Sequence, residues 1–291
     1  MLEGVMLLWF LLTALSLVFV MVDIRTTPES SVLKWGFILL TAYTGPLGAF
    51  MYVLGCREPL PGLHERYVAT RWRQVLGSTM HCVAGDGVGI LVGAVIASLF
   101  HLAGAADIAL EYALGFGFGW SVFQSLFMRG MAGGSYRRSL SKTFFPELLS
   151  MNCLMAGMVP VMTLAMKAVP ASVEPSRPEF WFVMSMALLV GFVTAYPMNW
   201  WLVSQHLKHG MMTMRPLSAF VKGGAENAVR QHHTPSEHTD SVKGESKPPM
   251  DGDVKSVSTS ALIWMIILSF AVFGLGLTIA IVFGGLQRVS A

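Results

Sequence analysis

The residues most able to do chemistry lie in a segment that otherwise reads as a membrane span. The apolar stretch "STMHCVAGDGVGILVGA" (78–94) contains His81, Cys82 and Asp86. Cys82 and Asp86 are four residues apart, so on a helix they share one face. At about 1.5 Å of rise per residue, Asp86 lies near mid-bilayer, where an acid costs about 2.5 kcal/mol or more unless it is protonated, paired or wetted. The alternative to a functional Asp86 is a structural hydrogen bond to Gln124.

Soft metal ligands are unusually frequent in this chain, which has 20 methionines. The segment 147–168 carries five of them at helical spacing, at 151, 155, 158, 162 and 166. Thioether and thiolate groups select Cu(I), although a methionine face is also ordinary core packing. The candidate ligands are Met80, His81, Cys82, Met151, Cys153 and Met155. Accessory candidates are His206, His209, His232, His233 and His238.

Other polar residues within apolar runs are candidates for proton coupling or transport. They are Asp86, Glu111, Gln124, Asn152 and Asn199. Glu147 follows Pro146, and we interpret this pair as the ordinary chemistry of a helix N-terminus.

Glycines at intervals of four predict close helix packing. Gly85, Gly89 and Gly93 continue the line of His81, and Gly115 and Gly119 continue that of Glu111. The short "AGAAD" link between the two runs predicts a hairpin, and small residues let helix backbones approach closely in lipid. A second interpretation is that the glycines leave room for a bound or permeating species.

The elements that position these residues are membrane helices. The chain of 291 residues is 54% hydrophobic and 13% charged, whereas soluble domains carry about 25% charged residues. We predict an all-α polytopic integral membrane protein with about seven transmembrane helices. The runs lie at about 5–22, 33–54, 76–102, 107–128, 147–168, 180–204 and 260–285.

The positions of lysine and arginine predict the orientation. Segments 55–74, 129–146 and 205–259 carry 15 of the 20, so we expect this side to be cytoplasmic. The N-terminus is then cytoplasmic and the C-terminus periplasmic. An even number of spans would put both ends on one side and make one run re-entrant. The predicted regions are an N-terminal two-helix hairpin (1–54), a four-helix core (55–210), a disordered, His-containing cytoplasmic loop (211–259), and a last helix with a short tail (260–291).

Four segments resemble a known family. They are "STMHCVAGDGVGI", "LGFGFGWSVFQSLFMRGMAGGSYRRSL", "PELLSMNCLMAGM" and "PEFWFVMSMALLVGFVTAYPMNWWLVSQHLKHGM". Over about 75–210 the chain resembles the bacterial membrane-domain family catalogued as domain of unknown function 4396. The resemblance implies a four-helix membrane core in the bacterial inner membrane and names no activity. It also implies copper-handling proteins as candidate partners.

These patterns predict a multi-pass transporter or membrane-embedded binding protein for a soft metal, Cu(I) before others. Copper is the one metal or cofactor expected. Beside lipid, a second copy of the chain is a candidate partner, and no nucleic acid is expected. No C-x-x-C, H-E-x-x-H or Walker motif occurs, and no nucleophile–base pair is readable, so we expect no enzyme. The alternatives are a membrane scaffold or partner subunit, and a proton-coupled transporter of a non-metal solute.

Overall fold

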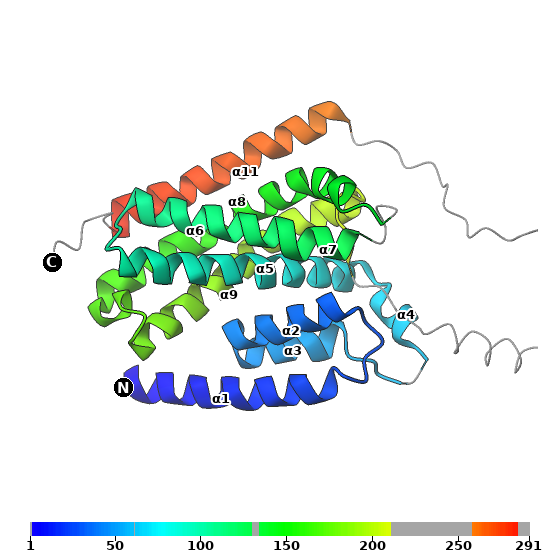
Figure 1. Cartoon of the computed structure of the whole chain (residues 1–291), viewed down its shortest axis with the longest axis horizontal. Helices are drawn as coiled ribbons and strands as arrows, with labels where there is room; N and C mark the ends of the chain where they lie inside the picture. The colour runs from blue at the N-terminus through cyan, green and yellow to red at the C-terminus, as the bar shows by residue number, and fades with distance from the viewer. Residues whose placement is uncertain (1, 61, 130–133, 211–257, 285–291) are drawn as a thin grey trace, which may run out of the picture.

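The computed structural model describes residues 2–60, 62–129, 134–210 and 258–284. These residues are helical almost throughout, as Figure 1 shows. Five helices are long and apolar enough to cross a membrane: α1 (Leu2–Asp23), α5 (Arg71–Leu99), α8 (Tyr136–Ala168), α9 (Pro178–Ser204) and α11 (Thr259–Ile279), the last continued by η3 (Ala280–Gly284). The prediction of an all-helical chain with several helices able to span a membrane is thereby confirmed. Most of the predicted loop 211–259 lies outside the described residues.

The predicted run 107–128 is one continuous helical path in three parts. It consists of α6 (Ala105–Phe118), a π-helical segment η1 (Gly119–Gln124) and α7 (Ser125–Met128). Two short elements, α4 (His64–Val68) and η2 (Pro170–Val173), lie in connections. Helix α8 begins at Tyr136, well before the expected start at residue 147, so Pro146 lies inside the helix and not at its first turn.

The run 33–54 does not cross the bundle, which corrects the prediction of a span there. It is split into α2 (Ser31–Thr44) and α3 (Pro46–Gly55). The rings of Phe37 and Tyr52 lie 5.5 Å apart between centroids, whereas a straight helix would advance about 22 Å over the same fifteen residues. Gly45, between the two helices, has φ +59°, a conformation that favours glycine. Pro46 follows it and has no backbone N–H, so it cannot continue the hydrogen bonding of α2. The segment is therefore a re-entrant hairpin.

The tip of this hairpin is packed inside protein at the middle of the bundle. A Cβ at Gly45 would meet the side chains of Trp9 and Thr13 in α1. The Ser185 hydroxyl of α9 donates to the Tyr43 carbonyl oxygen, and the Tyr43 ring packs against Gly87 of α5. Non-helical backbone at membrane depth is tolerated where protein buries it. Hydropathy could not reveal the turn, since a re-entrant hairpin buried in protein is as apolar as a span.

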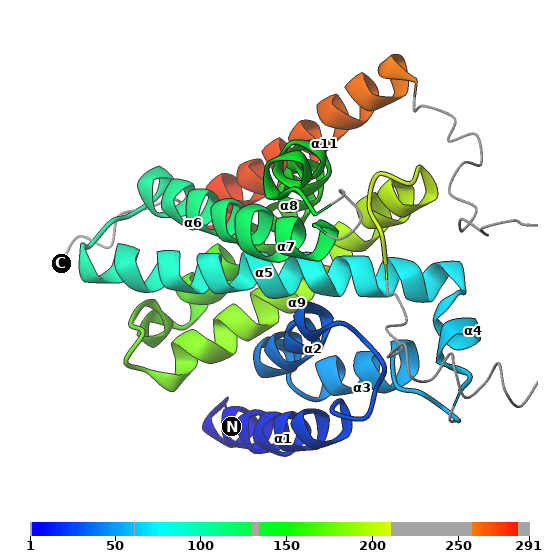
Figure 2. The same cartoon turned by 45° about the vertical axis from the view of Figure 1, so that its right-hand side comes forward.

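This hairpin returns to the end of the bundle from which it came, and α1 begins at the end of the bundle where η3 finishes (Figures 1 and 2). Contacts agree, since Trp9 packs on Phe182 near the start of α9, and Lys167 Nζ donates to the Phe283 carbonyl oxygen at 3.0 Å. The structure thus places the two ends together and not on opposite sides as predicted.

The re-entrant hairpin also increases the difference in the number of basic residues between the two ends of the bundle. Arg25 and Lys34 now lie at the end of the bundle that holds the other basic connections. Of the thirteen lysines and arginines in the described residues, all but Lys167 and Arg177 lie in or beside the α1–α2, α3–α5 and α7–α8 connections or in the segment after α9. Lys167 and Arg177 lie beside the α8–α9 connection, at the other end of the bundle. A re-entrant hairpin therefore fits the distribution of positive charge better than a seventh span does.

We expect topology reporters fused separately to the two ends of the chain to report the same side of the membrane. Alkaline phosphatase, active only outside the cytoplasm, and green fluorescent protein, fluorescent only inside, should give concordant results at both ends. A reporter in the exposed connection at Gly62 should give the opposite result. Opposite readings at the two ends would show that α2 and α3 cross the membrane.

Candidate functional site

Five polar side chains from three separate segments meet inside the bundle, and we call them the Cys82 cluster: Cys82, Asp86, Glu147, Ser150 and Lys208. All five are buried, with at most 1% of each residue exposed. Cys82 Sγ donates to Asp86 Oδ2 at 3.1 Å and lies 3.3 Å from Ser150 Oγ. Lys208 Nζ donates to Ser150 Oγ at 2.6 Å and pairs with Glu147 Oε2 at 2.7 Å.

The helical spacing of the cluster residues in α5 and α8 explains how four of the five side chains meet. Cys82 and Asp86 lie one helical turn apart on α5, as their spacing predicts. On α8, Glu147 and Ser150 are three residues apart and share a face that turns toward α5. The Ser150 hydroxyl also lies 3.2 Å from the Pro146 carbonyl oxygen, to which it donates within its own helix.

Lys208 reaches the cluster because α9 ends in a Schellman motif. The Leu207 amide donates to the Leu202 carbonyl and the His206 amide to the Val203 carbonyl. His206 takes the left-handed conformation, with φ +57°, at the position where glycine is usual. This reversal turns the chain back under α9, so that Lys208 points into the bundle.

The charges of the Cys82 cluster come close to balance. Burial alone lowers the pKa of Lys208, but attraction to Cys82, Glu147 and Asp86 outweighs burial and holds that pKa above its usual 10.5. One lysine cation then faces two carboxyl groups. Since an uncompensated buried charge is costly, the neutral arrangement has one carboxyl group protonated and the Cys82 thiol intact. The cluster therefore places one buried cation beside two carboxyl groups and a thiol.

The wall facing Asp86 is formed by glycine and by the π-helical segment η1. A Cβ at Gly119 would overlap Asp86 Oδ1, so only glycine leaves room for that carboxylate. Single π-helical turns occur often at functional sites. His81 is buried beside η1, with its ring 5.6 Å from that of Phe123 and 4.6 Å from that of Phe127, and neither of its ring nitrogens has a hydrogen-bond partner among the described residues.

The glycine line continues away from the Cys82 cluster as a helix contact. A Cβ at Gly89 would overlap the Leu114 carbonyl oxygen, and one at Gly93 would lie 2.8 Å from the Glu111 Cα. Gly85 lies against Phe123, and Gly115 lies against Ile90. These contacts are between α5 and the α6–η1 helix and leave no space for a permeating species.

The other proposed soft ligands do not face Cys82. Met80 packs against Gly36 of α2, and Met151 packs against Gly115 of α6. Cys153 belongs to a separate apolar group with Leu149, Met198 and Leu202. The methionine face of α8 is buried in the protein core: Met151, Met155 and Met158 are 0% exposed and Met162 is 2% exposed.

The remaining predicted residues are dispersed. The Asn152 amide group joins three helices, since it accepts from the Tyr112 hydroxyl at 2.6 Å and donates to Ser269 Oγ at 3.1 Å. Asn199 donates to the Ala195 carbonyl oxygen within α9. Glu111 is buried in α6, where its backbone lies against Gly93 of α5.

The predicted accessory histidines form no common site in the described residues. His206 is exposed, and His209 is half-buried, with burial and then the charge of His206 lowering its pKa. His232, His233 and His238 lie outside the described residues.

Sequence reasoning did not find Glu147, Ser150 and Lys208. Glu147 was interpreted as helix-terminal chemistry, and Lys208 was counted only as one of the basic residues of a connection. The sequence feature that could have indicated them is Glu147 itself, an acidic residue at the start of an apolar run. An acidic residue at membrane depth needs a polar or charged partner.

The comparisons with known proteins give one match. Residues 71–208 match the model of the family described as "Domain of unknown function (DUF4396)", which confirms the predicted resemblance. No curated protein and no solved structure matches the chain. The matched region begins at the first residue of α5 and ends at Lys208, so every member of the Cys82 cluster lies within it.

Proposed function

We propose that the DUF4396 domain of residues 71–208 is a proton-coupled membrane carrier for a divalent transition-metal ion. The observation that carries this proposal is the convergence of Cys82, Asp86 and Glu147, buried and from two helices, whose ligand atoms all lie within 4.8 Å of one another. Asp86 Oδ1 accepts no hydrogen bond among the described residues, so it is available to a cation. An ionisable cluster at membrane depth is a functional candidate by default.

The donor set favours a divalent ion of intermediate softness, such as Zn²⁺. One thiolate with two carboxylates suits Zn²⁺, whereas Cu(I) prefers thiolates and thioethers. The Cu(I) prediction needed Met80, Met151 and Cys153 to join Cys82, and these side chains point elsewhere. We therefore propose Zn²⁺ ahead of Cu(I).

We propose that binding of the metal ion at the Cys82 cluster is coupled to release of protons, because the total charge of the buried cluster must stay close to zero. In the ion-free state Lys208 offsets one carboxylate, while the second carboxyl group and the thiol keep their protons. A bound Zn²⁺ with one thiolate, two carboxylates and Lys208 is again neutral. Exchange of one Zn²⁺ for about two protons thus leaves the buried charge unchanged, and metal binding to such ligands releases protons. Lys208 serves as a fixed internal cation in both states.

The site lies nearer to the basic end of the bundle, which the positive-inside rule assigns to the cytoplasm. Both ends of the chain are then periplasmic in a bacterial inner membrane. The segments able to open the site toward the cytoplasm are η1, where a π-helical turn weakens the helix, and the reversal that carries Lys208.

Transport by the full chain in liposomes tests the proposal. With entrapped dyes for Zn²⁺ and for pH, we expect Zn²⁺ flux accompanied by about two protons per ion. Cys82→Ser and Asp86→Asn should each lower the Zn²⁺ flux at least about tenfold, since each removes a ligand. Cys153→Ser is the matched control, because Cys153 is a buried thiol in the same bundle but outside the cluster.

Each contrary outcome points to a different function. Zn²⁺ flux that is unchanged in Cys82→Ser and Asp86→Asn would overturn the site. Proton flux that needs Asp86 but not Cys82 or Zn²⁺ would favour a carrier of a non-metal solute. Absence of both binding and flux in the wild-type chain would favour a scaffold or partner subunit.

A further inference from the structure

A second group of metal-capable side chains lies outside the matched domain, and we call it the Cys56 cluster: Glu29, Cys56 and His64. Glu29 lies in the connection between α1 and α2, Cys56 directly follows α3, and His64 begins α4. All three are buried, with exposed fractions of 6%, 0% and 0%. They come together because the re-entrant hairpin brings the end of α3 back to the end of α1.

The three ligand atoms are close enough to bind one ion. The Cys56 sulfur, a Glu29 carboxylate oxygen and a His64 ring nitrogen all lie within 4.8 Å of one another. His64 Nε2 is 3.6 Å from Glu29 Oε1 and 3.0 Å from the Cys56 carbonyl oxygen. Ligands around tetrahedral Zn²⁺, with bonds of about 2.0–2.3 Å, lie about 3.5 Å apart. Binding thus requires the ligand atoms to approach one another by at most about 1.3 Å.

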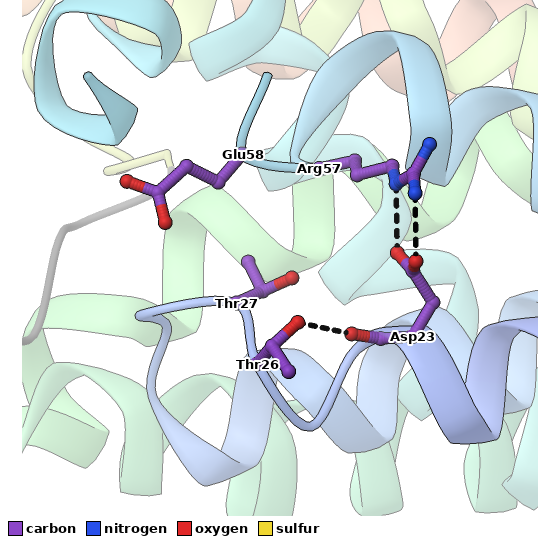
Figure 3. Close-up of a pocket in the computed structure, with 5 residues that line it drawn as sticks. All are labelled: Asp23, Thr26, Thr27, Arg57 and Glu58. Atoms are coloured by element: carbon purple, nitrogen blue, oxygen red, sulfur yellow. Dashed lines mark hydrogen bonds and ion pairs between the residues drawn. The ribbon is translucent and has the colours of Figure 1, made fainter. Parts of the chain in front are cut away.

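The backbone around the Cys56 cluster is fixed by an adjacent set of polar contacts. Figure 3 shows Arg57 paired with Asp23 through two bonds, Nε to Oδ2 and Nη2 to Oδ1, both of 2.9 Å. The Tyr52 hydroxyl lies 2.8 Å from both Asp23 Oδ2 and Thr27 Oγ1. These contacts tie the connection that carries Glu29 to the end of α3 that carries Cys56.

The loop that carries His64 is held in a similar way. Glu58 Oε1 accepts from the backbone amides of Gly62 at 2.7 Å and of His64 at 3.4 Å. In Figure 3, the Glu58 carboxylate points away from the Asp23–Arg57 pair. Asp23, Thr26, Thr27, Arg57 and Glu58 line a pocket, and Thr27 and Arg57 lie close in sequence to Glu29 and Cys56.

We propose that Glu29, Cys56 and His64 bind a Zn²⁺ ion that fastens the re-entrant hairpin to the connections at the basic end of the bundle. One thiolate, one carboxylate and one neutral imidazole neutralise a divalent ion, and this mixture of sulfur, nitrogen and oxygen ligands is typical of zinc. Binding releases the Cys56 thiol proton to solvent, and the neutral His64 ring carries its one hydrogen on Nδ1 so that Nε2 can donate its lone pair to the ion. The fourth position is open to water.

This inference does not rest on the proposed carrier function. The two clusters share no residue, and the Cys56 cluster lies outside residues 71–208. The role of the second ion is structural. Because the α2–α3 hairpin depends on contacts at its base and at its tip, a bound ion should stabilise the N-terminal region of the protein.

Co²⁺ titration of the full-length chain in detergent tests the proposal. Thiolate-to-cobalt charge-transfer absorption reports only sites that contain a cysteine, so histidines elsewhere in the chain do not interfere. The titration is done in the Cys82→Ser background, which removes the other cluster's thiol. We expect about one charge-transfer site per chain, displaced by Zn²⁺. Adding Cys56→Ser should abolish the band, and adding Glu29→Gln should weaken Co²⁺ binding at least about tenfold.

Cys153→Ser in the same Cys82→Ser background is the control and should leave the band unchanged. The proposal is overturned if the Cys82→Ser chain shows no charge-transfer band, or if its band survives Cys56→Ser. Size-exclusion chromatography and the melting temperature of each variant in EDTA show whether the fold is retained. Glu29→Gln keeps the size of the side chain, so we expect this variant to fold. Its effect on Co²⁺ affinity can therefore be measured even if Cys56→Ser folds poorly. Zn²⁺ should raise the melting temperature of the Cys82→Ser chain but not of the Cys56→Ser variants.

Discussion

Replacing Lys208 with methionine should lower the free energy of unfolding by about 3–5 kcal/mol, the cost expected when one partner of a buried ion pair is removed. Lys208 and Glu147 are both 0% exposed at the side chain and are 2.7 Å apart. Methionine preserves most of the volume of lysine but leaves Glu147 without its cation and Ser150 without a donor. Unfolding in detergent micelles, followed by circular dichroism, measures the change.

Two controls separate charge from packing in this experiment. Lys142→Met removes an exposed lysine of α8 and should leave stability unchanged within about 0.5 kcal/mol. Adding Glu147→Gln to Lys208→Met removes both charges and should recover most of the lost stability, since replacing a whole buried pair is often nearly neutral. If the double variant is as unstable as Lys208→Met alone, the ion pair is not the cause.

Gly89→Ala should lower the free energy of unfolding by about 1–3 kcal/mol, the usual cost of overpacking a tight contact. A Cβ at this position would overlap the Leu114 carbonyl oxygen and lie 2.5 Å from the Leu114 carbonyl carbon. Backbone atoms cannot rotate aside, so α5 and α6 must separate. The intrinsic helix preference of alanine, worth up to about 1 kcal/mol, offsets only part of this cost.

Gly117→Ala is the matched control on the same hairpin. No atom lies within 4 Å of a Cβ built at Gly117, so the substitution meets open space. We expect stability to be unchanged or to rise by up to about 1 kcal/mol through the better helix propensity of alanine. Equal effects of the two substitutions, measured by unfolding in detergent micelles, would contradict a close α5–α6 contact at Gly89.

The protein's class was predictable because apolar content and run length follow directly from the sequence. The α5–α6 hairpin was also predictable, since the link between its helices is too short for any other connection. Spacing placed Cys82 and Asp86 on one face and aligned the glycines with their partners across the hairpin, because residues four apart on a helix always share a face.

The sequence could not distinguish a re-entrant hairpin from a span. Residues 33–54 are apolar throughout, and the decision lies in Gly45 and Pro46, which allow the turn without requiring it. The packing of Trp9, Thr13 and Ser185 around the tip makes the turn stable at membrane depth. That single turn reverses the expected relation between the two ends of the chain.

By itself, the sequence indicated an apolar, helical chain, the resemblance of residues 71–208 to a known family, the faces of individual helices, and Cys82 and Asp86 as candidate site residues. Only the tertiary structure decided which of those faces meet. The rotation of α8 turns Glu147 and Ser150 toward Cys82 and turns Cys153 away, and the Schellman motif after α9 returns Lys208 to the interior. Helical periodicity relates residues within one helix, but the relative rotation of two helices depends on how their surfaces pack, and no local pattern records it.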